Sequence, residues 1–133
     1  MKKFLPIVSL LLLLFSCKKE EPLKDFRKTL AGTWELERTI TWVTVPPVAP
    51  GILLVFKEDG TFERKRHDTL VYSGTYTLQQ KQDCHPRSSN IILTTSDSSP
   101  GYEDYISVEN NKLELSTPNC WADGGGAIYR RVK

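Results

Sequence analysis

The chain has 133 residues, with 18 basic and 16 acidic side chains, a formal net charge of +2 and 39% hydrophobic residues. This length suits one domain with its own core and excludes two. Beyond the first 16 residues, which hold Lys2 and Lys3, basic and acidic side chains balance at 16 each. No basic block remains that would favour nucleic acid as a partner.

Residues 1–17 have the pattern of an export signal. Lys2 and Lys3 precede an apolar run over residues 4–15, which is shorter than the roughly 20 residues needed to span a bilayer. The Leu-Phe-Ser-Cys segment that ends at Cys17 resembles the lipobox of bacterial lipoproteins. That resemblance implies cleavage after residue 16, a lipid on the Cys17 thiol and a mature chain of 117 of the 133 residues. An ordinary secretory signal and an uncleaved N-terminal anchor are the alternatives.

Residues 17–22 are expected to form the lipidated cysteine and a charged tether, in which Pro22 disfavours helix. The Cys-Lys-Lys-Glu-Glu start is similar to the tag that directs Bacteroidetes-type lipoproteins to the cell surface. The alternative is a plain charged spacer. We therefore expect an outer-membrane lipoprotein, held to the membrane through Cys17, on the cell surface or the periplasmic face.

Two further cysteines, Cys84 and Cys120, form an even pair in an exported chain. One disulfide is the simplest prediction. It would close a loop of about 35 residues and contribute roughly 3–4 kcal/mol in the chain-entropy model. His85 adjoins Cys84, but these three side chains lack the spaced pairs of a zinc site, so we expect no metal.

Residues 23–133 are expected to form one β-domain. Helical spacing is confined to residues 23–31, and alternating apolar residues then dominate. Asp59-Gly60 is a strong hairpin signal. The predicted strands cover residues 33–42, 52–57, 61–67, 70–79, 91–95, 102–109, 112–116 and 127–132. Eight short strands joined mostly by hairpins favour an all-β, antiparallel up-and-down barrel over a two-sheet sandwich, because closure leaves no exposed edge.

The opening of the first strand resembles the Gly-X-Trp motif of lipocalins, with Gly32 and Trp34 after a helical turn. The segments Phe-Lys-Glu-Asp-Gly-Thr-Phe at 56–62, Ser-Gly-Thr-Tyr at 73–76, Asn-Lys-Leu at 111–113 and Tyr-Arg-Arg-Val at 129–132 are similar to those of lipocalin-like domains in small Bacteroidetes-type lipoproteins. The resemblance covers residues 23–133. It implies a lipocalin-like barrel in which Arg130 or Arg131 packs across Trp34 and helps close the barrel.

Catalytic patterns are weak throughout the chain, and we expect neither an enzyme nor a cofactor. His67 and His85 lie at a strand end and in a loop, with no nucleophile elbow, zinc helix or phosphate loop. Adjacent Glu103 and Asp104 would point to opposite faces of a strand, so they cannot act as a pair.

Binding of a small hydrophobic or amphipathic ligand is the leading functional prediction. Arg38 and Arg64 would contact a polar head group, while Trp42, Phe62 and Tyr76 would hold an apolar body. One alternative is a barrel filled by its own side chains, in which the arginines pair with Asp104 or lie at the rim and no ligand binds. Another is a non-catalytic interaction or structural lipoprotein. It would dock an envelope protein through the loops at 46–51, 80–90 and 117–126.

Overall fold

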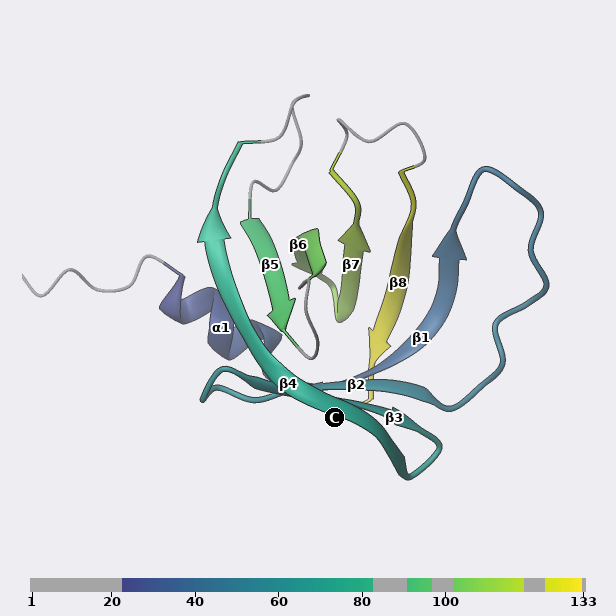
Figure 1. Cartoon of the computed structure of the whole chain (residues 1–133), viewed down its shortest axis with the longest axis horizontal. Helices are drawn as coiled ribbons and strands as arrows, with labels where there is room; N and C mark the ends of the chain where they lie inside the picture. The colour runs from purple at the N-terminus through teal and green to yellow at the C-terminus, as the bar shows by residue number, and fades with distance from the viewer. Residues whose placement is uncertain (1–22, 83–90, 97–101, 119–123, 133) are drawn as a thin grey trace, which may run out of the picture.

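The computed structural model describes residues 23–82, 91–96, 102–118 and 124–132. These residues form one short helix followed by eight strands (Figure 1). The elements are α1 (Lys24–Leu30), β1 (Gly32–Ile40), β2 (Ile52–Phe56), β3 (Thr61–Arg66), β4 (Thr69–Gln80), β5 (Ile91–Ser96), β6 (Tyr102–Glu109), β7 (Lys112–Ser116) and β8 (Gly126–Arg131). The predicted all-β class, the strand count and the N-terminal helical turn are confirmed.

The strands form a closed barrel. Each strand pairs antiparallel with the next one in the sequence, and β8 returns to pair with β1. Because the ring closes, every strand has two neighbours and no sheet edge is left open. The up-and-down order is confirmed, and the sandwich alternative is excluded.

The β2–β3 hairpin fixes the register that positions two aromatic side chains inside the barrel. Gly60 has a φ of +87° at the turn, a conformation that glycine adopts without strain. The Asp59 carboxylate accepts hydrogen bonds from the backbone N–H of Thr61 at 2.9 Å and from its hydroxyl at 2.6 Å. This turn places Phe62 directly opposite Phe56 in the ladder.

Helix α1 packs against one end of the barrel (Figure 1). Leu30 at the end of α1 and Trp34 in β1 are both fully buried and belong to one core cluster. The Trp34 indole N–H donates to the Leu30 carbonyl at 2.8 Å. Between them Gly32 has a φ of +140°, which a residue with a Cβ rarely adopts. The glycine and the tryptophan of the predicted motif therefore make the corner between helix and barrel.

Arg131 in β8 completes this corner, as the resemblance implied for one of two arginines. Its guanidinium lies 4.2 Å from the Trp34 ring centroid and donates to the backbone carbonyls of Ala31, at 3.0 Å, and Thr29. The neighbouring Arg130 points the other way and forms an exposed ion pair with Glu35 at 2.6 Å. The last strand is thus tied to the first by Arg131 on the inside and Arg130 on the outside.

A β-bulge in β1 changes which side chains face inward. Leu36 pairs with Tyr129, but Arg38 pairs with Ile128, so two steps along β1 match one along β8. This reverses the alternation and leaves Arg38 exposed, on the opposite face from Leu36. The strand then ends at Ile40, and Trp42 lies in the following loop, 87% exposed. The expectation that Arg38 and Trp42 face the interior is therefore wrong.

Candidate ligand-binding site

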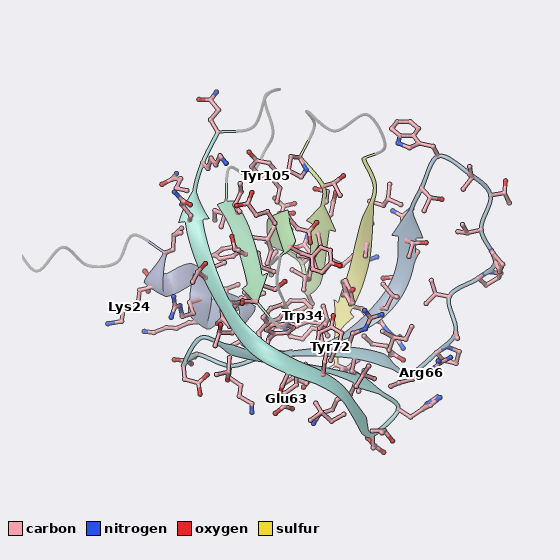
Figure 2. All side chains as sticks on the ribbon, viewed as in Figure 1. Lys24, Trp34, Glu63, Arg66, Tyr72 and Tyr105 are labelled. Carbon is pink, nitrogen blue, oxygen red and sulfur yellow. The ribbon has the colours of Figure 1, made fainter. Side chains whose placement is uncertain are left out.

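A cavity of about 440 Å³ lies inside the barrel, within the range of about 300–1,000 Å³ that is usual for small-molecule sites. In Figure 2, Trp34 and Tyr72 lie within the ring of strands, whereas Lys24 and Arg66 lie outside it. The cavity is lined by Leu54, Phe56, Phe62, Arg64, Tyr72, Leu93, Thr95, Tyr102, Asp104, Leu115 and Tyr129.

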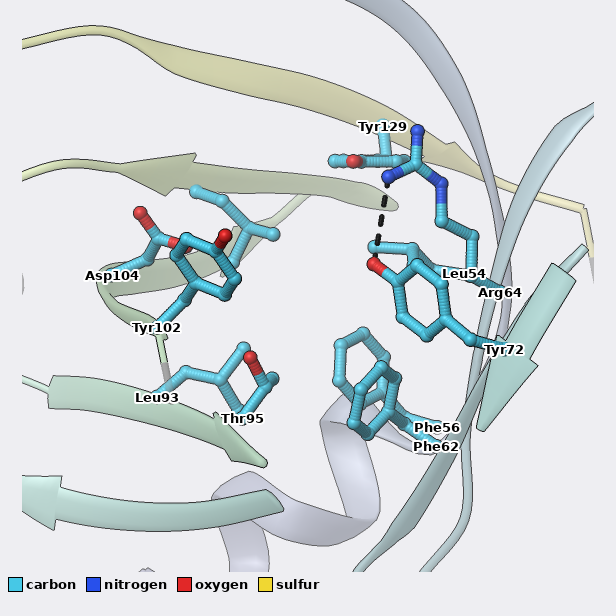
Figure 3. A pocket seen from close by; sticks show the side chains of 11 residues that line it. Leu54, Phe56, Phe62, Arg64, Tyr72, Leu93, Thr95, Tyr102, Asp104 and Tyr129 are labelled. Carbon is cyan, nitrogen blue, oxygen red and sulfur yellow. Dashed lines mark hydrogen bonds between the residues drawn. The ribbon is translucent and has the colours of Figure 1, made fainter. Parts of the chain in front are cut away.

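Aromatic rings form the wall of the cavity nearest α1 (Figure 3). Phe56 and Phe62 are stacked with centroids 6.2 Å apart, and Tyr72 meets Phe62 edge-on at 5.9 Å. Beneath them Tyr76 meets Phe56 edge-on at 5.3 Å, and its hydroxyl donates to the Lys57 carbonyl at 2.6 Å. Offset and edge-on pairs of this kind fix ring positions. The wall is therefore a preformed apolar surface.

Arg64 supplies a positive charge above this wall. It pairs across the ladder with Tyr72, its guanidinium carbon lies 5.8 Å from the Tyr72 ring centroid, and Nη1 is 3.5 Å from the Tyr72 hydroxyl. The hydrogen bond to Tyr72 raises the pKa of the Arg64 side chain against the opposing effect of burial. At 3.5 Å that bond is long, so donors of the guanidinium remain available to a ligand.

Asp104 supplies a negative charge on another wall. In the ladder it lies opposite Leu93, just as Tyr102 lies opposite Thr95, and all four line the cavity. Burial raises the pKa of the Asp104 carboxyl, because removal from water penalises the ionised form. Figure 3 shows Asp104 and Tyr102 across the cavity from Arg64.

Tyr129 adds a neutral hydroxyl on the Arg64 side of the cavity (Figure 3). Burial raises its pKa to about 12, so the phenol keeps its proton at neutral pH. The Tyr72 hydroxyl lies on the same side, within reach of Arg64. The site therefore combines one cation, one acid, polar hydroxyls and an apolar wall, which suits noncovalent binding of an amphipathic molecule.

The five side chains predicted to bind a ligand fall in three places. Phe62 and Arg64 line the cavity. Tyr76 is buried below the aromatic wall and supports Phe56. Arg38 and Trp42 do not line it, because the bulge turns the first outward and the strand ends before the second.

Several lining residues were missed by sequence reasoning, above all Tyr72 and Tyr129. The sequence held part of the information needed to find them. Tyr72 alternates in step with the buried Tyr76 along the same strand, and Tyr129 begins the Tyr-Arg-Arg-Val segment at 129–132. What the pattern does not contain is the ladder register. It is the register that sets Tyr72 opposite Arg64 and Tyr129 opposite Leu36.

The predicted lipidation site Cys17, the predicted disulfide Cys84–Cys120 and His85 all lie outside the described residues. Within residues 23–82, 91–96, 102–118 and 124–132, no group of three or more histidine, cysteine or acidic side chains is placed to hold a metal ion. Helix α1 is the only helix in those ranges, and it is too short to cross a membrane.

A scan against protein-family models found no match, and a search of curated proteins found none either.

Proposed function

We propose that this chain is a lipid-anchored protein of the cell envelope whose barrel binds a small amphipathic ligand without catalysis. The observation that carries the binding proposal is the interior cavity of about 440 Å³, with an aromatic wall and two charged side chains. A barrel packed solid by its own side chains would leave no such volume.

The lipid anchor rests on the sequence. A basic start, a short apolar run and Cys17 support export and lipidation, and the lipobox and lipocalin-like resemblances support an envelope-bound barrel. Mass spectrometry of the N-terminal peptide tests the anchor, because a diacylglycerol on Cys17 adds a defined mass that Cys17→Ala lacks. Protease treatment of intact cells then tests the side of the outer membrane, since a surface barrel is digested and a periplasmic one survives.

The binding proposal is tested with a neutral apolar fluorescent probe added to the purified protein. We expect saturable fluorescence enhancement that Leu54→Trp, which places a larger side chain on the cavity wall, abolishes. The exposed Val71→Trp on β4 is the matched control. Equal enhancement in all three proteins would place the probe outside the barrel and contradict the proposal.

A second candidate function is docking of another envelope protein. Its support is the loop between β1 and β2, where Trp42 and Val43 are 87% and 70% exposed. The Trp42 indole N–H donates to the Gly124 carbonyl at 2.6 Å, so the loop is held next to the start of β8. Under this alternative Trp42→Ser would remove an envelope partner in crosslinking on cells while leaving probe binding intact.

A further inference from the structure

We infer that the cavity selects a zwitterionic ligand, with an acidic group bound at Arg64 and a basic group bound at Asp104, at separate positions on an apolar body. This inference rests on the proposed binding function and names the chemistry of the ligand. It starts from the two charged side chains that line the same cavity.

The strand order holds these two charges apart. Arg64 belongs to β3 and Asp104 to β6, which are three positions apart around the ring of eight strands. In Figure 3 the guanidinium and the carboxylate lie on facing walls with open space between them. They form no ion pair with each other within 4.0 Å, so the alternative in which Asp104 neutralises the arginine inside a filled barrel does not describe this site.

Each charge also lacks a counter-ion elsewhere in the described part of the chain. The Arg64 guanidinium contacts the ring and the hydroxyl of Tyr72, both of which are neutral. No side chain in the described ranges donates a hydrogen bond to the Asp104 carboxylate, and burial is the sole cause of its raised pKa. A partly buried charge without a counter-ion is costly, and a group of opposite charge on a ligand would lower that cost.

The surroundings of the two charges fit one molecule that carries both complements. An acidic group at Arg64 would also lie near the neutral hydroxyls of Tyr72 and Tyr129, which can donate to it. The Phe56–Phe62 wall would take the apolar segment between the two charged ends. Charge-assisted hydrogen bonds at both ends are strong and geometrically selective. A fatty acid or a simple amine would leave one protein charge unpaired.

Three probes of matched shape test the inference on the purified protein by isothermal titration calorimetry at pH 7. The zwitterion is 4-(aminomethyl)benzoate, 4-methylbenzoate lacks the amine, and 4-methylbenzylamine lacks the carboxylate. We expect the zwitterion to bind at least about tenfold more tightly than either single-charge probe, as one lost charge-assisted contact predicts.

Two variants test which protein side chain binds each charged end of the zwitterion. In Asp104→Asn the zwitterion and 4-methylbenzoate should bind with equal affinity within about threefold. Both should still bind more tightly than 4-methylbenzylamine, which lacks the carboxylate. In Arg64→Met the zwitterion and the amine should become equal instead. A neutral apolar probe that still binds both variants shows that the barrel is folded and open.

The outcomes separate the inference from the proposed function. If the neutral probe binds but the zwitterion binds no more tightly than 4-methylbenzoate, the cavity is an anion or fatty-acid site. The inference is then overturned while the proposed function stands. If the zwitterion is preferred but Asp104→Asn keeps the whole preference, the amine is bound elsewhere and the inference is equally overturned. If neither the neutral probe nor any charged probe binds, the binding function itself fails.

Discussion

Arg131→Ala should destabilise the barrel far more than the same change at its neighbour Arg130. The Arg131 guanidinium donates to two backbone carbonyls and lies 4.2 Å from the Trp34 ring centroid. A hydrogen bond from a charged donor contributes about 1.5–3 kcal/mol, and a cation–π contact about 0.5–1 kcal/mol where water has access. Because Arg131 is only half-buried, we take the low ends, which sum to about 3.5 kcal/mol for the two hydrogen bonds and the cation–π contact.

Urea unfolding followed by far-ultraviolet circular dichroism measures this loss. With an m-value of about 2 kcal/mol/M, a loss of about 3.5 kcal/mol lowers the midpoint by about 1.7 M. Arg131→Lys keeps the charge but not the fork that reaches both carbonyls, so its midpoint should lie between the wild-type and alanine values.

Arg130→Ala is the matched control. It removes an exposed ion pair with Glu35 on the outer face, and such pairs contribute little, so the midpoint should fall much less. A drop for Arg131→Ala that is no larger than that for Arg130→Ala would refute the idea that the inner arginine closes the barrel.

Three further outcomes test the core, the aromatic wall and the buried acid. Leu113→Ala should cost about 2–5 kcal/mol in urea unfolding, because Leu113 is fully buried in the core; a cost below 1 kcal/mol would contradict this packing. Tyr76→Phe should cost about 1 kcal/mol by losing the hydrogen bond to the Lys57 carbonyl; no measurable cost would show that bond to be unimportant. Folding raises the pKa of Asp104 above its unfolded value of about 3.9, so the folded state binds more protons at this group and its contribution to stability falls as pH rises from about 4. The unfolding free energy of Asp104→Asn minus that of wild type should therefore increase between pH 4 and pH 7, and a difference that is flat or decreasing would contradict the burial of the carboxyl.

Local patterns predicted the barrel well because successive side chains of a strand alternate between the core and the outer face. The aromatic pair Phe56 and Phe62 follows from the Asp59-Gly60 turn, which is a local signal. The prediction failed where one extra residue matters. A single bulge after Leu36 moves Arg38 to the outer face. The alternation of side chains in the sequence of β1 does not predict this bulge.

The charges of the candidate site could be found only in part. Arg64 was predicted from its place beside Phe62, and its distance from Asp104 was not predictable. The strand order that separates β3 from β6 was predicted, but the distance also depends on the ladder register, which places Asp104 opposite Leu93. The choice between Arg130 and Arg131 beside Trp34 depended in the same way on the register between the first and last strands. Contacts between distant segments are what an alternating pattern does not contain.

The contact between Arg131 and the backbone before Trp34 also has a kinetic consequence. It belongs to the pairing of β1 with β8 that closes the ring, and it joins residues 100 positions apart. The other seven strand pairings join strands that are neighbours along the chain. Closing a long loop costs more chain entropy than forming a hairpin, so the hairpins can form early and ring closure should come last. Until then β1 and β8 are open edges that can pair with another chain. The interval before closure is therefore when a newly made chain is most exposed to aggregation.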